Sequence, residues 1–167
     1  VDGKHVFGTA LNMKVRHPVY KFNMFGDKQE IIPPGSRSPV THFEMHPSNG
    51  LLYYTHGDGN LYRSGDRIKT YDMTNGEIEV YIDRPGGAGA PKLSKDGKFL
   101  AYVHRDDRQT SLVVRNIETN EESIVSTNLD YDRMDSGSFY GSYTNMSWHP
   151  NNKEIFVSYG GGIHSVN

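Results

Sequence analysis

The sequence contains no cysteine, which excludes disulfide bonds and thiolate metal sites but does not identify a compartment. It has no run of about 18 apolar residues, so no membrane-spanning helix is predicted. The formal net charge of -2 is close to neutral, so the sequence predicts no basic surface for binding nucleic acid. The opening VDGKHVFGTA lacks both a signal-peptide pattern and an initiator methionine. We therefore expect a processed chain or a piece of a longer one.

What the sequence does contain favours strands and turns. Its 167 residues suffice for one domain with a core, although only 35% are hydrophobic. The aromatic residues are mostly tyrosine, 11 in number, and Tyr, Val, Ile and Phe favour strands. The 18 glycines and 8 prolines indicate many turns. No segment has the pattern of a long helix, so the composition predicts an all-β fold.

One turn pattern recurs along the chain. HPSNGLLYYT, SKDGKFLAYV and HPNNKEIFVS align without a gap, and DGKHVFGT at the start fits the same frame. Lys4, Gly50, Lys98 and Lys153 are then equivalent, with spacings of 46, 48 and 55 residues. Asp96-Gly97 predicts a tight hairpin with positive φ angles, and Ser48-Asn49 and Asn151-Asn152 occupy the same place. Trp148 aligns with Met45 and Leu93, which predicts a core position.

A second turn follows each unit. Asn23, Asp72 and Asn116 are equivalent, and each stands between two strand-like segments. A unit of four short strands over about 45 to 50 residues is the length of a propeller blade. A β-sandwich also has many short strands, but it does not explain turns repeated in one frame.

The predicted strands add up to about three and a half blades. We place blade 1 at residues 1–35, blade 2 at 36–86, blade 3 at 87–130 and an incomplete blade 4 at 131–167. Their strand numbers of about three, four, four and three are too few to close a propeller of four to eight blades. The sequence thus predicts a partial propeller, a fragment of a closed six- to eight-bladed one.

The units resemble a known repeat. The pattern P-x-x-S-x-D-G-K-x-x-A-Y-V followed by L-x-V-x-N-x-E-T-x-E, between Pro91 and Glu122, resembles the TolB-type, WD40-like propeller repeat. Residues 85–167 are most similar to the propeller module that precedes the barrel of large metal-dependent amidohydrolases. This resemblance implies a hydrolase as the parent protein, and a divalent metal only in its barrel domain. The barrel's His-x-His motif is absent from this sequence.

Candidate site residues are few. His42 and His46, in HFEMH, are weak metal-ligand candidates, because on an alternating strand His42, Glu44 and His46 share one face. A polar strand face or a turn histidine explains them as well, since His149 repeats the position of His46. A peptide- or sugar-binding surface is the second possibility, although its residues also suit packing between blades: Tyr53, Tyr54, Tyr62 and Tyr71. GGAGAP, residues 86–91, is interpreted as a crossover between blades, because no helix follows it.

These patterns predict no catalytic or cofactor-binding residue in this chain. The first functional hypothesis is a non-catalytic propeller module that shields or gates a hydrolase domain located elsewhere in the parent. The alternatives are a TolB-like protein-interaction propeller and the gating propeller of a serine peptidase. The expected partners are the remaining blades and a hydrolase domain, or a second chain that covers the open blade edges. Exported proteins often use this repeat, so the resemblance implies a periplasmic or secreted parent.

Overall fold

The computed structural model describes residues 4–9, 19–32, 40–57, 65–106, 109–127, 129 and 145–167. Over these residues the chain forms fourteen strands in four antiparallel sheets, and no helix. The predicted all-β partial propeller is therefore confirmed. In chain order the strands are β1 (His5–Thr9), β2 (Val19–Asn23), β3 (Lys28–Ile32), β4 (Val40–Met45), β5 (Leu51–His56), β6 (Arg67–Asp72), β7 (Ile78–Ile82), β8 (Ala88–Leu93), β9 (Phe99–Asp106), β10 (Gln109–Asn116), β11 (Glu122–Ser126), β12 (Met146–Trp148), β13 (Ile155–Tyr159) and β14 (Gly162–Val166).

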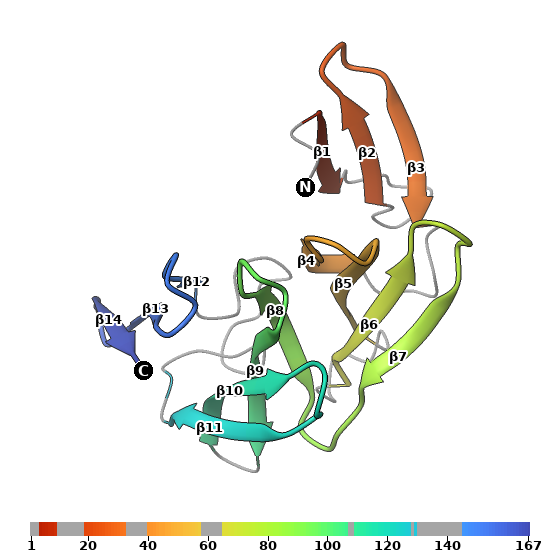
Figure 1. Ribbon diagram of the computed structural model, residues 1–167. Coiled ribbons are helices and arrows are strands. Elements are labelled where there is room, and N and C mark those ends of the chain that lie inside the picture. The colour runs from red at the N-terminus through yellow and green to blue at the C-terminus, as the bar shows by residue number, and fades with distance from the viewer. Residues whose placement is uncertain are drawn as a thin grey trace.

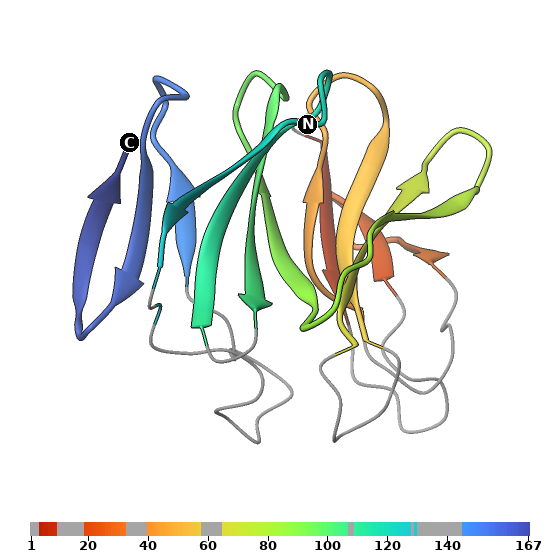
Figure 2. The ribbon, with the colours of Figure 1, turned by 90° about the horizontal axis from the view of Figure 1, so that it is seen from below.

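The four sheets follow one another around an arc, as Figure 1 shows. Strands β4, β8 and β12 lie nearest the centre, and β3, β7 and β11 lie at the periphery. Each sheet is ordered as its strands occur along the chain, which is the order expected of consecutive hairpins in a blade. The sheets stand side by side with their strands along a common direction (Figure 2). We call them blades 1 to 4. Each falls within its predicted range, and the exact boundaries stay predictions.

The first repeated turn is present in blades 2, 3 and 4. In each, the amide of the residue before the turn donates a hydrogen bond to the carbonyl five residues later. The predicted frame is therefore confirmed, because these bonds join aligned residues: His46 to Leu51 (2.8 Å), Ser94 to Phe99 (2.9 Å) and His149 to Glu154 (2.8 Å).

The positive φ angles within these turns differ from the prediction. Gly97 (φ 72°) and Asn152 (φ 58°) are left-handed and equivalent, whereas in blade 2 the left-handed residue is Gly50 (φ 76°). The expected pair Ser48-Asn49 was wrong, because glycine adopts this region at less cost than asparagine and stands one position later. One left-handed residue per turn suffices, since each loop is longer than a two-residue hairpin.

The second repeated turn is capped by the residue that precedes it. In blades 1 to 3 a side-chain oxygen of that residue accepts a backbone N–H two residues later, which is an Asx turn. The aligned residues Asn23, Asp72 and Asn116 are therefore confirmed as equivalent. The three bonds are Phe25 N to Asn23 Oδ1 (2.9 Å), Thr74 N to Asp72 Oδ1 (2.7 Å) and Glu118 N to Asn116 Oδ1 (2.9 Å).

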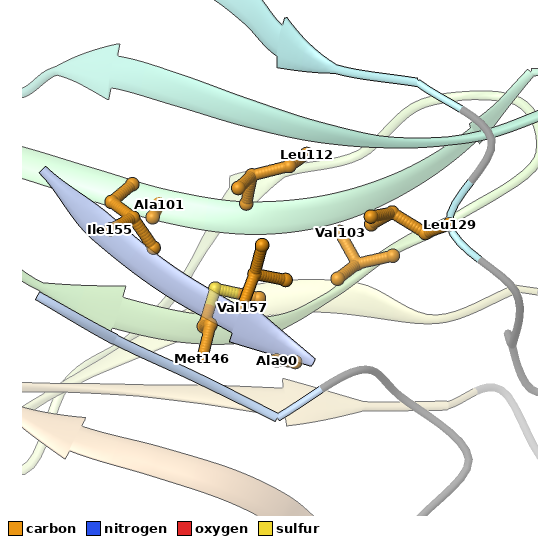
Figure 3. Packing of buried hydrophobic residues seen from close by; sticks show 8 residues of the cluster. All are labelled: Ala90, Ala101, Val103, Leu112, Leu129, Met146, Ile155 and Val157. Atoms are coloured by element: carbon orange, nitrogen blue, oxygen red, sulfur yellow. The ribbon is translucent and has the colours of Figure 1, made fainter. Parts of the chain in front are cut away.

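Side chains between neighbouring blades form three hydrophobic clusters. Because strand side chains alternate, each blade gives one face to the blade before it and the other to the blade after it. The cluster between blades 3 and 4 is the one in Figure 3, where Val157 of β13 points into the group of residues from β9 and β10. The clusters are Val19, Ile31, Val40, Leu52 and Tyr54 between blades 1 and 2; Tyr53, Ile68, Ile82, Ala88, Leu100, Tyr102 and Val113 between blades 2 and 3; and Ala90, Ala101, Val103, Leu112, Leu129, Met146, Ile155 and Val157 between blades 3 and 4.

The peripheral strands contain a bulge at one repeated place. The pairing registers of β3, β7 and β11 each skip one residue opposite the neighbouring strand, and the skipped residues are Ile31, Tyr81 and Val125. A bulge bends its strand and changes the direction in which a side chain points. These three positions are therefore structurally equivalent.

A charged cluster joins blades 2 and 3 near their periphery. The carboxylate of Glu122 accepts hydrogen bonds from Arg84 (2.5 Å), Arg115 (2.9 Å) and the hydroxyl of Tyr102 (2.9 Å). Arg84 also lies over the Tyr102 ring, and Arg115 lies over the ring of Tyr81 in blade 2. Burial raises the pKa of Glu122, but the three donors outweigh it and hold that pKa below its usual value. The cluster thus fastens the two blades together through an ionised carboxylate.

Candidate functional site

His46 is a buried turn residue that also touches the next blade. Its Nδ1 accepts the backbone N–H groups of Ser48 and Asn49, each at 3.2 Å. Its Nε2 lies 3.0 Å from the carbonyl oxygen of Gly97, to which it donates. A ring that accepts at Nδ1 and donates at Nε2 is neutral and uses both nitrogens. His149 of blade 4 caps its turn in the same way, because its Nδ1 accepts the backbone N–H of Asn151 at 3.2 Å. Capping the turn therefore explains why His46 and His149 occupy the same position of the repeat.

His42 lies in a bulge of β4. The register skips it between Thr41 and Phe43, and its φ of 47° is left-handed. The strict alternation that we predicted for HFEMH therefore fails at His42. Ala90, the equivalent residue of β8, has φ 54°, so the strained backbone repeats as part of the architecture. Burial lowers the pKa of His42; Asp66 opposes this shift and Lys92 adds to it.

The neighbourhood of His42 is charged. Glu44 of β4 and Lys92 of β8 form an ion pair between the two central strands. No cluster of three or more His, Cys, Asp or Glu side chains that could hold a metal occurs within the described residues. The metal hypothesis for His42 and His46 therefore depends on the sequence pattern alone.

The four candidate tyrosines have different places. Tyr53 and Tyr54 are 1% and 2% exposed, and burial is the main cause that raises the pKa of each to about 12. Both side chains pack between blades, which is one of the two alternatives that the sequence allowed. Tyr71 is half-buried against the cluster between blades 1 and 2. Tyr62 lies outside the described residues.

An open cleft between blades 3 and 4 is the strongest candidate binding site. Its volume is about 190 Å³. The Trp148 indole stacks on the Phe99 ring at a centroid distance of 6.2 Å and donates a hydrogen bond to the Lys92 carbonyl at 2.9 Å. Trp148 is half-buried against the core cluster of these blades, which agrees with its predicted core position. The walls and rim comprise Phe99, Val114, Val125, Trp148, Asn152, Lys153, Ile155, Val166 and Asn167.

A second cleft lies between blades 1 and 2 and has about 220 Å³. Lys21 lines it at the position that Val114 has in the first cleft, and His46 and Ser48 contribute further polar atoms. Apolar pockets with a few polar groups at the edge are the usual form of binding sites. The cleft between blades 3 and 4 fits this description better. Nothing in the sequence alone indicated either cleft, because each is made by residues of two blades.

We expect His46→Ala to lower the free energy of unfolding by about 2 to 3 kcal/mol, because two backbone N–H groups and the Gly97 carbonyl lose their partner in a buried place. His149→Ala is the matched control. Its ring is half-buried and accepts one backbone N–H, so about 1 kcal/mol or less is expected. Urea unfolding measures both variants. Equal losses for the two would show that the contact to Gly97 contributes nothing.

None of the described residues belongs to a helix long and apolar enough to cross a membrane. No protein-family model matches the chain, and no curated protein matches it at a significant level. Solved structures do match. TolB from Acinetobacter baumannii is similar with a TM-score of 0.73 at 18% identity, over 97% of this chain and 38% of that one.

Two further structures have related folds. The nidogen/laminin complex matches with a TM-score of 0.69 at 11% identity, over 93% of this chain and 52% of that one. Oligogalacturonate lyase in complex with manganese matches with a TM-score of 0.60 at 16% identity, over 89% of this chain and 40% of that one. The chain thus spans about half or less of each of these proteins. At such identities the likeness establishes the fold alone, which is a partial β-propeller similar to that of TolB.

Proposed function

We propose that this chain is a non-catalytic protein-interaction module built from propeller blades. The observation that carries the proposal is the open apolar cleft between blades 3 and 4, with an aromatic wall and polar residues at its rim. Such clefts are typical of recognition sites. The likeness to TolB supports the same conclusion at the level of the fold.

A finer proposal concerns the parent protein. The resemblance of residues 85–167 to propellers of metal-dependent amidohydrolases supports a parent in which these blades shield, orient or gate a hydrolase barrel. The divalent metal would then belong to the barrel, and the remaining blades would be the neighbours of this chain. We also propose a periplasmic or secreted location, in keeping with the likeness to TolB.

An interaction propeller without a hydrolase domain is the second candidate, and the fit to TolB over nearly the whole chain favours it. The sequence that adjoins this chain in its gene separates the two. Further blades that lead into a His-x-His strand support the hydrolase parent. Blades that end the protein support the interaction propeller alone.

The test of the interaction function has two arms. The purified chain is assayed against amide and peptide substrates with and without added zinc, and no zinc-dependent turnover is expected. A protein that co-purifies with the parent is then produced separately and titrated into the chain by calorimetry, where saturable binding is expected. Robust hydrolysis by the isolated chain would overturn the proposal, as would the absence of binding by every purified candidate partner.

A further inference from the structure

Two aromatic rings that pack in one junction between blades are replaced by small side chains at the aligned positions of the next junction. Between blades 2 and 3, Tyr53 and Tyr81 meet edge to face with centroids 5.1 Å apart. Tyr53 pairs with Thr70 in blade 2, and Ala101 pairs with Val114 at the same place in blade 3. Tyr81 and Val125 are the equivalent bulge residues of the peripheral strands. Two large rings of one blade thus correspond to two small side chains of the next.

The cleft between blades 3 and 4 lies where these rings are missing. Val125 and Val114, the strand partner of Ala101, both line it. Phe99 lines it from the same blade, and its ring stacks on Trp148 of blade 4, which lies on the opposite wall. An apolar cavity of about 150 Å³ in another protein holds a benzene molecule. At about 190 Å³, this cleft has room for one aromatic ring.

The rim of the cleft has a positive charge. Lys153 is exposed and follows Asn152, whose side-chain oxygen accepts the backbone N–H of Lys95 at 2.9 Å. In the part of the chain that the structure describes, neither lysine forms an ion pair. Glu154, the next residue, is held by Asn151 and Ser165. Carboxylates beside the cleft would therefore meet favourable charge.

We propose that the cleft between blades 3 and 4 binds one aromatic side chain from an acidic segment of a partner protein. The proposal rests on the interaction function proposed above and gives that function a partner chemistry. The ring takes the place that Tyr53 and Tyr81 fill between blades 2 and 3. The flanking carboxylates lie beside Lys153 on the rim. A buried aromatic anchor with charged neighbours at its edge is the usual form of a binding hot spot.

Trp148 makes the test direct, because it is the single tryptophan of the chain and it lines the cleft. The probe is the peptide acetyl-Glu-Phe-Glu-amide, titrated into the chain while tryptophan fluorescence is recorded. A saturable change is expected. Acetyl-Glu-Ala-Glu-amide should give no saturable change, since it lacks the ring. Acetyl-Lys-Phe-Lys-amide should bind more weakly, since its charges are repelled at the rim.

Two variants locate the binding. Val125→Tyr restores the side chain that blade 2 has at this place and is expected to weaken binding at least about tenfold, as for the loss of a buried anchor site. Lys153→Glu changes only the exposed rim and should reverse the preference between the acidic and the basic peptide. Lys98→Glu is the matched control, because Lys98 has the same turn position beside the junction that Tyr53 and Tyr81 fill. It should leave binding unchanged.

Each outcome decides one claim. No saturable response to the phenylalanine peptide, an equal response to the alanine peptide, or unchanged binding in both Val125→Tyr and Lys153→Glu overturns the aromatic-anchor proposal. Should Val125→Tyr fail to fold, the exposed Lys153→Glu still decides the charge preference. A purified partner that binds the wild-type chain and both variants equally would retain the interaction function and exclude this cleft. Catalysis by the isolated chain would overturn the proposed interaction function, but peptide binding in the cleft would remain valid as a separate result.

Discussion

Gly86→Ala is expected to destabilise the chain by about 3 to 5 kcal/mol, the sum of backbone strain and a backbone clash. Gly86 has φ +83°, a conformation that alanine adopts at a cost. A Cβ at this residue would lie 1.9 Å from the carbonyl oxygen of Arg105 in β9. That oxygen belongs to a strand in the middle of blade 3, so it cannot move without breaking strand pairing. Urea unfolding monitored by circular dichroism measures the loss.

Gly26→Ala separates the two causes. Gly26 has φ +90°, close to that of Gly86, but a Cβ there would meet nothing within 4 Å. Its replacement should therefore cost only the backbone strain, about 1 kcal/mol. The difference between the two variants is the contribution of the close approach between the turn after blade 2 and strand β9. Equal losses would show that the chain relieves the contact by a local shift.

The repeat could be predicted because its determinants are local. Turn residues at fixed spacing specify hairpins by their own backbone preferences and side-chain caps, so the amino-acid sequence by itself sufficed to align Asn23, Asp72 and Asn116. The same holds for the turn before β9, where Asp96-Gly97 combines a cap with a left-handed residue. The number of strands and the propeller class followed from this alignment.

The contacts between blades could not be predicted in this way. They join residues about fifty positions apart, such as His46 with Gly97, and the turn pattern is the same whether or not such a bond forms. The alternation expected for HFEMH failed because a bulge adds a residue without any signal in the local composition. The cleft depends on side-chain volume at matched positions. Ala101 and Val125 become informative only after the strand pairing aligns them with Tyr53 and Tyr81.

The open cleft and the stability of the arc both depend on how neighbouring blades pack. Neighbouring blades pack through side chains that vary from junction to junction, while the turns and strands repeat. The junction of blades 2 and 3 is filled by aromatic rings and fastened by a charged cluster. The junction of blades 3 and 4 is packed at its centre and open at one edge. Variation at a few junction positions gives one arc both a closely packed junction and an open cleft, which we propose as the recognition site.

Tyr102→Ala is the second change for which we expect a large effect, about 3 to 5 kcal/mol. Tyr102 is 0% exposed and packs between blades 2 and 3, so its removal leaves a cavity that the β-sheet cannot fill. Burial and the hydrogen bond to Glu122 raise the pKa of Tyr102, so the hydroxyl stays protonated and donates. Tyr102→Phe keeps the ring and should cost about 1 kcal/mol. Thermal and urea unfolding distinguish the two variants.

The contribution of Glu122 should depend on pH in a defined direction. Its pKa is lower in the folded chain than in the unfolded one, so its contribution is fully present above the unfolded value of about 4.3 and is lost as the pH falls through the folded pKa. Glu122→Gln should therefore lower stability by about 1 to 3 kcal/mol at neutral pH and by less at pH 3. A difference in the free energy of unfolding between wild type and Glu122→Gln that stays constant from pH 7 to pH 3 would contradict this.

Combining Tyr102→Phe with Glu122→Gln should lower the free energy of unfolding by less than the sum of the single changes, because both remove the same hydrogen bond.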